Sequence, residues 1–136
     1  MKPYLSKAAE TLRNQINAAF VHRDRKSDGW ISDYEHKLRK SDHNPLPSGE
    51  VCGLDIDAGL SDERGISYAL ADQIRLCAKS DKRISYIIHA KKIASRRSLW
   101  KWKNYTGINP HYSHIHISFK PDQDGKEFDI PLLKGN

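Results

Sequence analysis

Cysteine is scarce in this chain of 136 residues, which has Cys52 and Cys77 and no CxxC pair. A small secreted domain held by several disulfides is therefore excluded, and we expect two reduced, buried thiols. No apolar run approaches the roughly 20 residues that cross a membrane. The N-terminal segment also lacks the apolar stretch of a secretory signal. These absences predict a cytoplasmic protein without membrane insertion.

Acidic residues are missing between Asp81 and Asp122, although the whole chain has 17 Asp and Glu against 23 Lys and Arg. The formal net charge is +6 and the pI is near 9.3. Lys and Arg occur throughout the chain, and such a basic surface attracts a polyanion, whether nucleic acid, an anionic membrane or an anionic cell wall. Charge alone does not choose among these partners.

Hydrophobic periodicity predicts two helices, and β-branched runs predict three strands. The helices are expected at residues 4–20 and 66–79, and the strands at 51–59, 83–90 and 114–119. Residues 91–95 could add a short hairpin arm. The long polar segment between the first helix and the first strand is of the kind that is usually functional or disordered. This order predicts an α+β fold, a single domain over residues 1–136 with a small, mostly antiparallel sheet and flanking helices.

Three histidines, His111, His114 and His116, cluster at the last predicted strand. Side chains two positions apart on a strand point to the same face, so His114 and His116 lie together. Two imidazoles on one face can serve a single metal site as ligand and base. The alternative is an ordinary strand with surface histidines.

Asp55 lies between two apolar residues of a predicted buried strand, where a carboxylate is costly unless it is paired or bound to a cation. Asp57 shares its face and is the rival candidate. A catalytic zinc usually has three protein ligands from His, Asp or Glu. His43, from the turn-rich segment upstream, can complete such a set with Asp55 and a strand histidine.

Several segments resemble a known family: DGWISD at 28–33, RKSDHNP at 39–45, GLDID at 53–57 and NPHYSHIHIS at 109–118. They are similar to the zinc D-alanyl-D-alanine carboxypeptidases and L-alanyl-D-glutamate peptidases, a group that includes many phage endolysins. The run HYSHIH is also similar to the end of the penicillin-insensitive murein endopeptidases. The resemblance implies a Zn²⁺ site formed by His43, Asp55 and His116.

The chain departs from the carboxypeptidase branch in two ways. Asp55 follows His43 by 12 residues, a longer gap than is usual there, so an extended loop must connect the two. The catalytic glutamate of that branch has no counterpart, which implies a histidine base as in the endopeptidases. Two registers stay open. In the one we favour, His116 is the ligand and His114 the base; in the other, His114 is the ligand and His111 the base.

Arg39 and Ser41 match the arginine and serine with which the family grips its substrate, so the resemblance implies a substrate-binding role for both. Arg39 could equally be a solvated charge. Trp100, Trp102 and Tyr105 could stack on nucleic-acid bases, flank a cleft, or anchor a loop to the core.

The sequence thus predicts a monomeric zinc metallopeptidase, an endopeptidase or D,D-carboxypeptidase that acts on bacterial peptidoglycan after release from the cytoplasm. No nucleic-acid partner is expected. The alternative is a basic module that binds nucleic acid or cell wall without catalysis, which leaves Asp55 and the histidines unexplained. A two-histidine phosphoesterase is disfavoured, because His116-Ile117-Ser118 has no second H-x-S/T partner.

Overall fold

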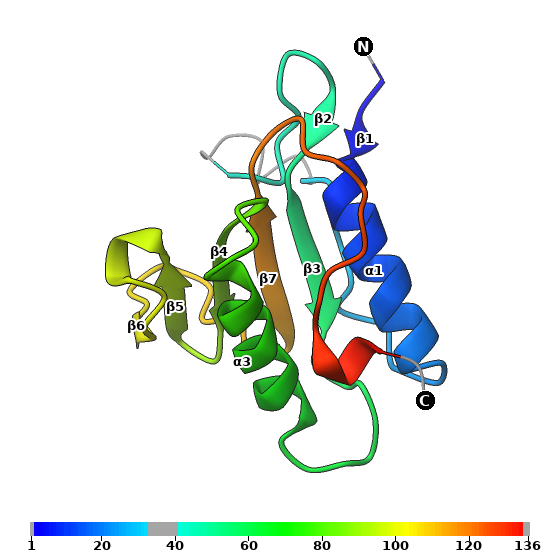
Figure 1. The fold of residues 1–136 in the computed structure, drawn as a ribbon, viewed down its shortest axis with the longest axis vertical. Helices are drawn as coiled ribbons and strands as arrows, with labels where there is room; N and C mark the ends of the chain where they lie inside the picture. The colour runs from blue at the N-terminus through cyan, green and yellow to red at the C-terminus, as the bar shows by residue number, and fades with distance from the viewer. Residues whose placement is uncertain (1, 33–40, 135–136) are drawn as a thin grey trace.

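The computed structural model describes residues 2–32 and 41–134, which form an α+β fold (Figure 1). Its main elements follow in chain order. They are β1 (Tyr4–Leu5), α1 (Lys7–Ala19), β2 (Glu50–Val51), β3 (Gly53–Asp57), α3 (Ile66–Ala78), β4 (Ile84–His89), β5 (Lys92–Ser95), η1 (Arg96–Ser98), β6 (Lys103–Asn104), β7 (His114–Phe119) and η2 (Pro131–Leu133). The predicted fold class is confirmed.

A five-stranded antiparallel sheet with the strand order β3-β7-β4-β5-β6 forms the centre of the fold. In the pairing of β3 with β7, Asp55 lies opposite His116 and Asp57 lies opposite His114. A bulge in β4 then places Tyr86 opposite Ser118 on the other side of β7. Strand β7 therefore brings together polar side chains from its two neighbouring strands, β3 and β4.

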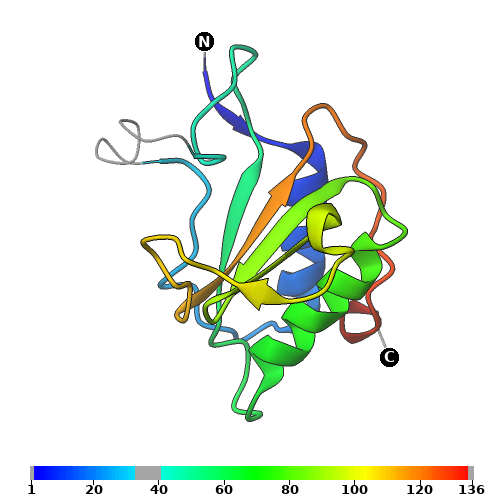
Figure 2. The same ribbon diagram turned by 90° about the vertical axis from the view of Figure 1, so that its left-hand side faces the viewer.

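Both helices pack on one face of this sheet, as Figure 2 shows from the side. The apolar side chains of β7 that face them are Ile115, Ile117 and Phe119, each at most 3% exposed. Alternation turns His114, His116 and Ser118 to the opposite face, where loops cover the sheet in place of helices.

The predicted helix at 4–20 begins later than expected, at Lys7. The Ser6 side chain accepts a hydrogen bond from the Ala9 amide and so caps the helix. Residues 4–5 instead form β1, which pairs in parallel with β2. The two short strands were missed because neither has enough residues to show a period.

Cys52 and Cys77 are both buried and unpaired, as predicted. Burial raises the pKa of Cys52 to about 11, so this thiol stays protonated near neutral pH. Among the helices of the described residues, none is both long and apolar enough to cross a membrane.

Candidate metal centre

The face of the sheet that turns away from the helices carries a cluster of histidines around Asp55. The carboxylate oxygens of Asp55 lie 2.9 Å from His116 Nδ1, 3.2 Å from His43 Nε2 and 3.6 Å from His114 Nε2. The ring of His111 lies 4.7 Å from that of His114, measured between centroids. The structure therefore brings together all five residues that the sequence nominated as metal ligands or catalytic groups.

His43 reaches this cluster from the turn at residues 41–44, which lies against β3. Its Nδ1–H donates a hydrogen bond of 2.9 Å to the carbonyl oxygen of Trp30. Trp30 is itself held at the edge of β3, because Gly29 and Asp55 exchange backbone hydrogen bonds of 2.7 and 3.1 Å. A carbonyl oxygen only accepts, so a neutral His43 has its lone pair on Nε2, facing Asp55.

Gly53 lets the turn approach the sheet this closely. A Cβ at Gly53 would lie 3.0 Å from His43 Nδ1 and 3.0 Å from the carbonyl carbon of Asp42. Any larger residue would therefore push His43 away from Asp55.

His116 is oriented by a chain of hydrogen bonds on its other side. Ser118 Oγ donates its one proton to Asp42 Oδ2 at 2.8 Å, and the Tyr86 hydroxyl donates to the same oxygen at 2.6 Å. Ser118 must then accept the 2.8 Å bond from His116 Nε2–H. A neutral His116 therefore has its lone pair on Nδ1, again facing Asp55.

The hydrogen-bond pattern thus leaves three groups, His43 Nε2, His116 Nδ1 and the Asp55 carboxylate, with lone pairs directed at one another. Burial raises the pKa of Asp55, but hydrogen bonds from His116 and His43 in their protonated forms outweigh it and hold that pKa below its usual value. Burial lowers the pKa of His43, yet its interactions with Asp55 raise it overall. These three groups therefore favour a positive charge among them, and either bound protons or a cation can supply it.

A zinc ion fits these residues. Tetrahedral zinc with bonds of about 2.0–2.1 Å separates its ligand atoms by roughly 3.3 Å, close to the 3.2 Å between His43 Nε2 and Asp55. The ligand atoms of His43, Asp55 and His116 all lie within 4.8 Å of one another. Both histidines also have the partner on the remaining ring nitrogen that is typical of metal ligands.

A second group of possible ligands, Asp55, His111 and His114, shares the same carboxylate. His111 Nδ1 and His114 Nε2 are buried and have no hydrogen-bond partner among the described residues. Burial, followed by the neighbouring histidines, lowers the pKa of His111 to about 4, and burial also lowers the pKa of His114. Both imidazoles are therefore neutral near pH 7, and their unpartnered nitrogens are available to a ligand.

His111 is held in a left-handed backbone conformation, with φ of 59°. Its amide donates to Asn109 Oδ1, and its carbonyl oxygen accepts from the Ala90 amide and from His89 Nδ1–H. Such conformations are uncommon outside glycine and persist where the surroundings impose them, often at functional sites. His89, which the sequence did not nominate, thus positions the loop that carries His111.

Asp57, the alternative metal ligand to Asp55, instead forms hydrogen bonds with the backbone. Its two oxygens accept hydrogen bonds of 2.7 Å from the amides of Gly59 and Ser27. It belongs to neither group of possible ligands.

A cavity of about 390 Å³ opens onto the cluster. Of the cluster, His43, Asp55, His111 and His116 line it, whereas His114 does not; Ser41, Tyr86, Tyr105 and Ile108 also contribute to the lining. This volume lies in the usual range for small-ligand sites. Ser41 accepts a hydrogen bond from the His43 amide and lines the cavity. Arg39, the other predicted substrate-binding residue, lies outside the described residues.

The aromatic residues upstream of the cluster separate into two roles. Trp100 is buried in the core, and Trp102 packs against the core with Nε1–H donating to Asp72. Tyr105 instead lines the cavity. A larger cavity, of about 700 Å³, lies near α3 and η2, but there Arg83 is already paired with Asp81 and Asp124.

Comparisons with family models, with curated proteins and with solved structures found no match to this chain.

Proposed function

We propose that the protein is a zinc-dependent peptidase that hydrolyses a stem-peptide or crosslink bond of bacterial peptidoglycan. The main support for a metal site is that three lone-pair donors converge: His43 Nε2, Asp55 and His116 Nδ1. Each histidine is fixed by a partner on its other ring nitrogen. The choice of peptidoglycan rests on the resemblance of the motifs.

Zinc in this position would lower the pKa of a bound water to about 7 and polarise the scissile carbonyl. His114 then acts as the general base, because its Nε2 is neutral, unpartnered among the described residues and 3.6 Å from Asp55. The proton that it takes from the attacking water passes to the leaving amine. His111 lies beside both strand histidines, with ring centroids 4.7 Å from His114 and 5.4 Å from His116, and would be the base in the alternative register.

The partners of His43 and His116 favour the register in which His116 is the ligand. Metal-binding histidines almost always donate their second ring nitrogen to a carbonyl, a carboxylate or a comparable acceptor. His116 meets this requirement through Ser118 and Asp42. The corresponding ring nitrogen of His114 is Nδ1, which has a 3.3 Å contact with the exposed Ser113 hydroxyl.

The function is tested by digestion of purified peptidoglycan, followed by mass spectrometry of the released fragments. Zinc-loaded protein should release peptides with a new amino terminus, and a chelator should stop the release. Protein that binds no zinc and leaves the peptidoglycan intact would refute the peptidase and favour the non-catalytic binding module.

Ser118→Ala should weaken zinc binding by about 10- to 100-fold, the usual effect of losing a partner that orients a metal ligand. Without the hydroxyl, His116 Nε2–H loses its acceptor and the ring loses its fixed tautomer. The measurement is competition for zinc with a chromophoric chelator. Ser113→Ala, the same substitution beside His114, should leave the affinity nearly unchanged. A larger effect from Ser113→Ala would indicate that His114 is the ligand.

A further inference from the structure

The excess positive charge of this protein comes from one segment of the chain. Residues 82–121 contain nine of the 23 Lys and Arg residues and none of the 17 Asp and Glu residues. The rest of the chain therefore has 14 basic residues against 17 acidic ones and is slightly negative. In the fold, this segment runs from β4 to the end of β7; its strands β5 and β6 lie at one edge of the sheet, whereas β7 lies inside it (Figure 1).

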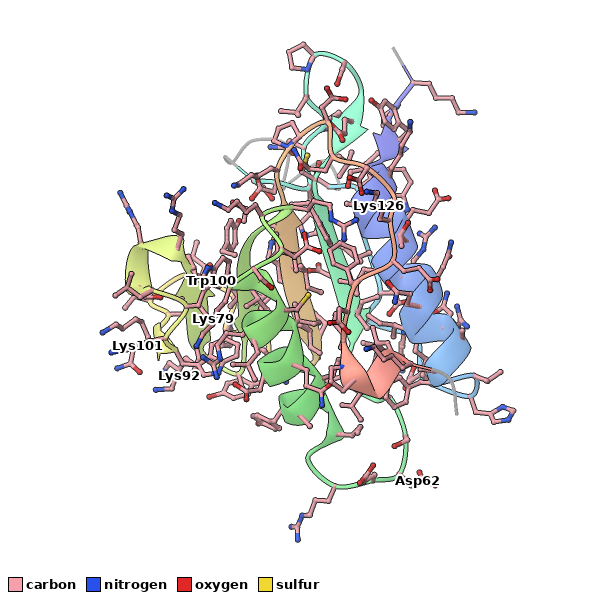
Figure 3. All side chains as sticks on the ribbon, in the orientation of Figure 1. Asp62, Lys79, Lys92, Trp100, Lys101 and Lys126 are labelled. Carbon is pink, nitrogen blue, oxygen red and sulfur yellow. The ribbon has the colours of Figure 1, made fainter. Side chains whose placement is uncertain are left out.

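Part of this segment surrounds a pocket of about 430 Å³ at the end of the sheet where β4 begins and β7 ends. Four cationic residues line it: Lys79, Lys82, Arg96 and Lys120. None of its lining residues is acidic, and within the described part of the chain none of the four cations forms an ion pair. Figure 3 shows Lys79 together with Lys92, Lys101 and Trp100 on the side of the molecule that holds β5 and β6.

The nearby carboxylates do not neutralise this pocket. Asp81 and Asp124 are both held by Arg83, at 2.6 and 3.0 Å. Four unpaired cations around one hollow repel one another, and a bound anion relieves that repulsion. The pocket is therefore suited to a ligand with several negative charges.

The aromatic residues of this region favour a polyanion without bases. Trp100 is 8% exposed, so its ring is not available for stacking. Trp102 is partly buried, with Arg75 over its ring at 5.8 Å and Asp72 bonded to its indole nitrogen. Binding of single-stranded nucleic acid typically depends on exposed aromatic faces. Leu99, 75% exposed, is the one well-exposed apolar residue of the lining, too little apolar surface to anchor a protein in a membrane.

We propose that this basic pocket binds the phosphodiester chain of an anionic polymer attached to the bacterial cell wall. Lysine ammonium groups and the arginine guanidinium are the usual ligands of phosphate oxygens. The polymer's attachment to the wall rests on the proposed function, whereas the anionic character of the ligand rests on the pocket alone. Binding here would hold the protein near its substrate without occupying the metal centre.

The test is an isothermal calorimetric titration of the protein with purified poly(glycerol phosphate), repeated at several salt concentrations. The variant K79Q/K82Q/R96Q/K120Q should bind about 10- to 100-fold more weakly than wild type at low salt. The slope of log K against log salt should become shallower by roughly 0.7 for each phosphate that the variant leaves unbound. The matched control K7Q/R25Q/K26Q/R64Q removes the same charge from exposed positions elsewhere and should bind nearly as wild type does.

Circular dichroism and cleavage of a soluble stem peptide are measured on the same variants, which separates binding from folding and from catalysis. The pocket variant should keep its fold and its peptide cleavage, if wild type cleaves. The pocket would be refuted if both variants weakened polymer binding equally, or if neither variant weakened it. Tighter, pocket-dependent binding to DNA or to anionic vesicles than to poly(glycerol phosphate) would refute the assigned ligand. Polymer binding without peptide cleavage would support the pocket and refute the proposed peptidase.

Discussion

Replacing Asp55 with alanine should abolish zinc binding and peptide cleavage while leaving the fold intact. Asp55 contributes the one negative charge of the proposed ligand set and lies between its two histidines. Loss of a carboxylate from a three-ligand site leaves two neutral imidazoles, which hold zinc far more weakly. Zinc content is measured by atomic emission after dialysis, and the fold by circular dichroism.

Thermal unfolding gives a second measurement of the same site. A ligand that binds only the folded state, at a hundredfold excess over its Kd, stabilises a protein by about 2.7 kcal/mol. Zinc should therefore raise the Tm of wild type and should leave that of Asp55→Ala unchanged.

The matched control is Asp57→Asn, on the same face of the same strand. Asp57 accepts two backbone hydrogen bonds from loops that flank β3. Its replacement should cost about 1–3 kcal/mol of folding stability, because a buried acceptor is removed, yet leave the zinc content unchanged. Loss of zinc from Asp57→Asn with retention in Asp55→Ala would show that Asp57 is the ligand.

The cluster around Asp55 could be predicted because strand alternation is a local property of the sequence. In the run from His114 to Phe119, every second residue is apolar, and this pattern by itself places the histidines on one face. Ser118 follows the same alternation and could have been nominated by the same rule. Asp55, a carboxylate between two apolar residues of a predicted strand, indicated a paired or metal-bound group just as clearly.

The groups that orient these ligands could not be predicted, because they meet only in the folded chain. The partner of His43 is a backbone carbonyl, that of Trp30, which has no signature in the sequence. Asp42 reaches Ser118 across 76 positions, through the packing of a turn against the far end of β7. The long gap between His43 and Asp55 is likewise explained by tertiary structure, because it contains β2, which pairs with β1.

His114→Gln should keep zinc and lose about 10²- to 10⁴-fold in the rate of cleavage, the usual contribution of a general base. Glutamine fills a similar space but cannot take the proton of the attacking water. The wild-type rate should rise with pH through the pKa of His114, because only the neutral imidazole accepts a proton. Burial lowers this pKa, so the cleavage rate should rise at a pH below the usual titration range of histidine. The His114→Gln variant should show no such rise.

His116→Gln is the companion variant, since it alters the neighbouring histidine on the same face of β7. It should lose zinc and activity together, because His116 Nδ1 faces Asp55 at 2.9 Å with its other nitrogen held by Ser118. Zinc content and single-turnover rates are measured for both variants under the same conditions. If His114→Gln loses its zinc and His116→Gln keeps it, the assignment is reversed. His114 is then the ligand, and His111, whose Nδ1 is buried and unpartnered among the described residues, is the base.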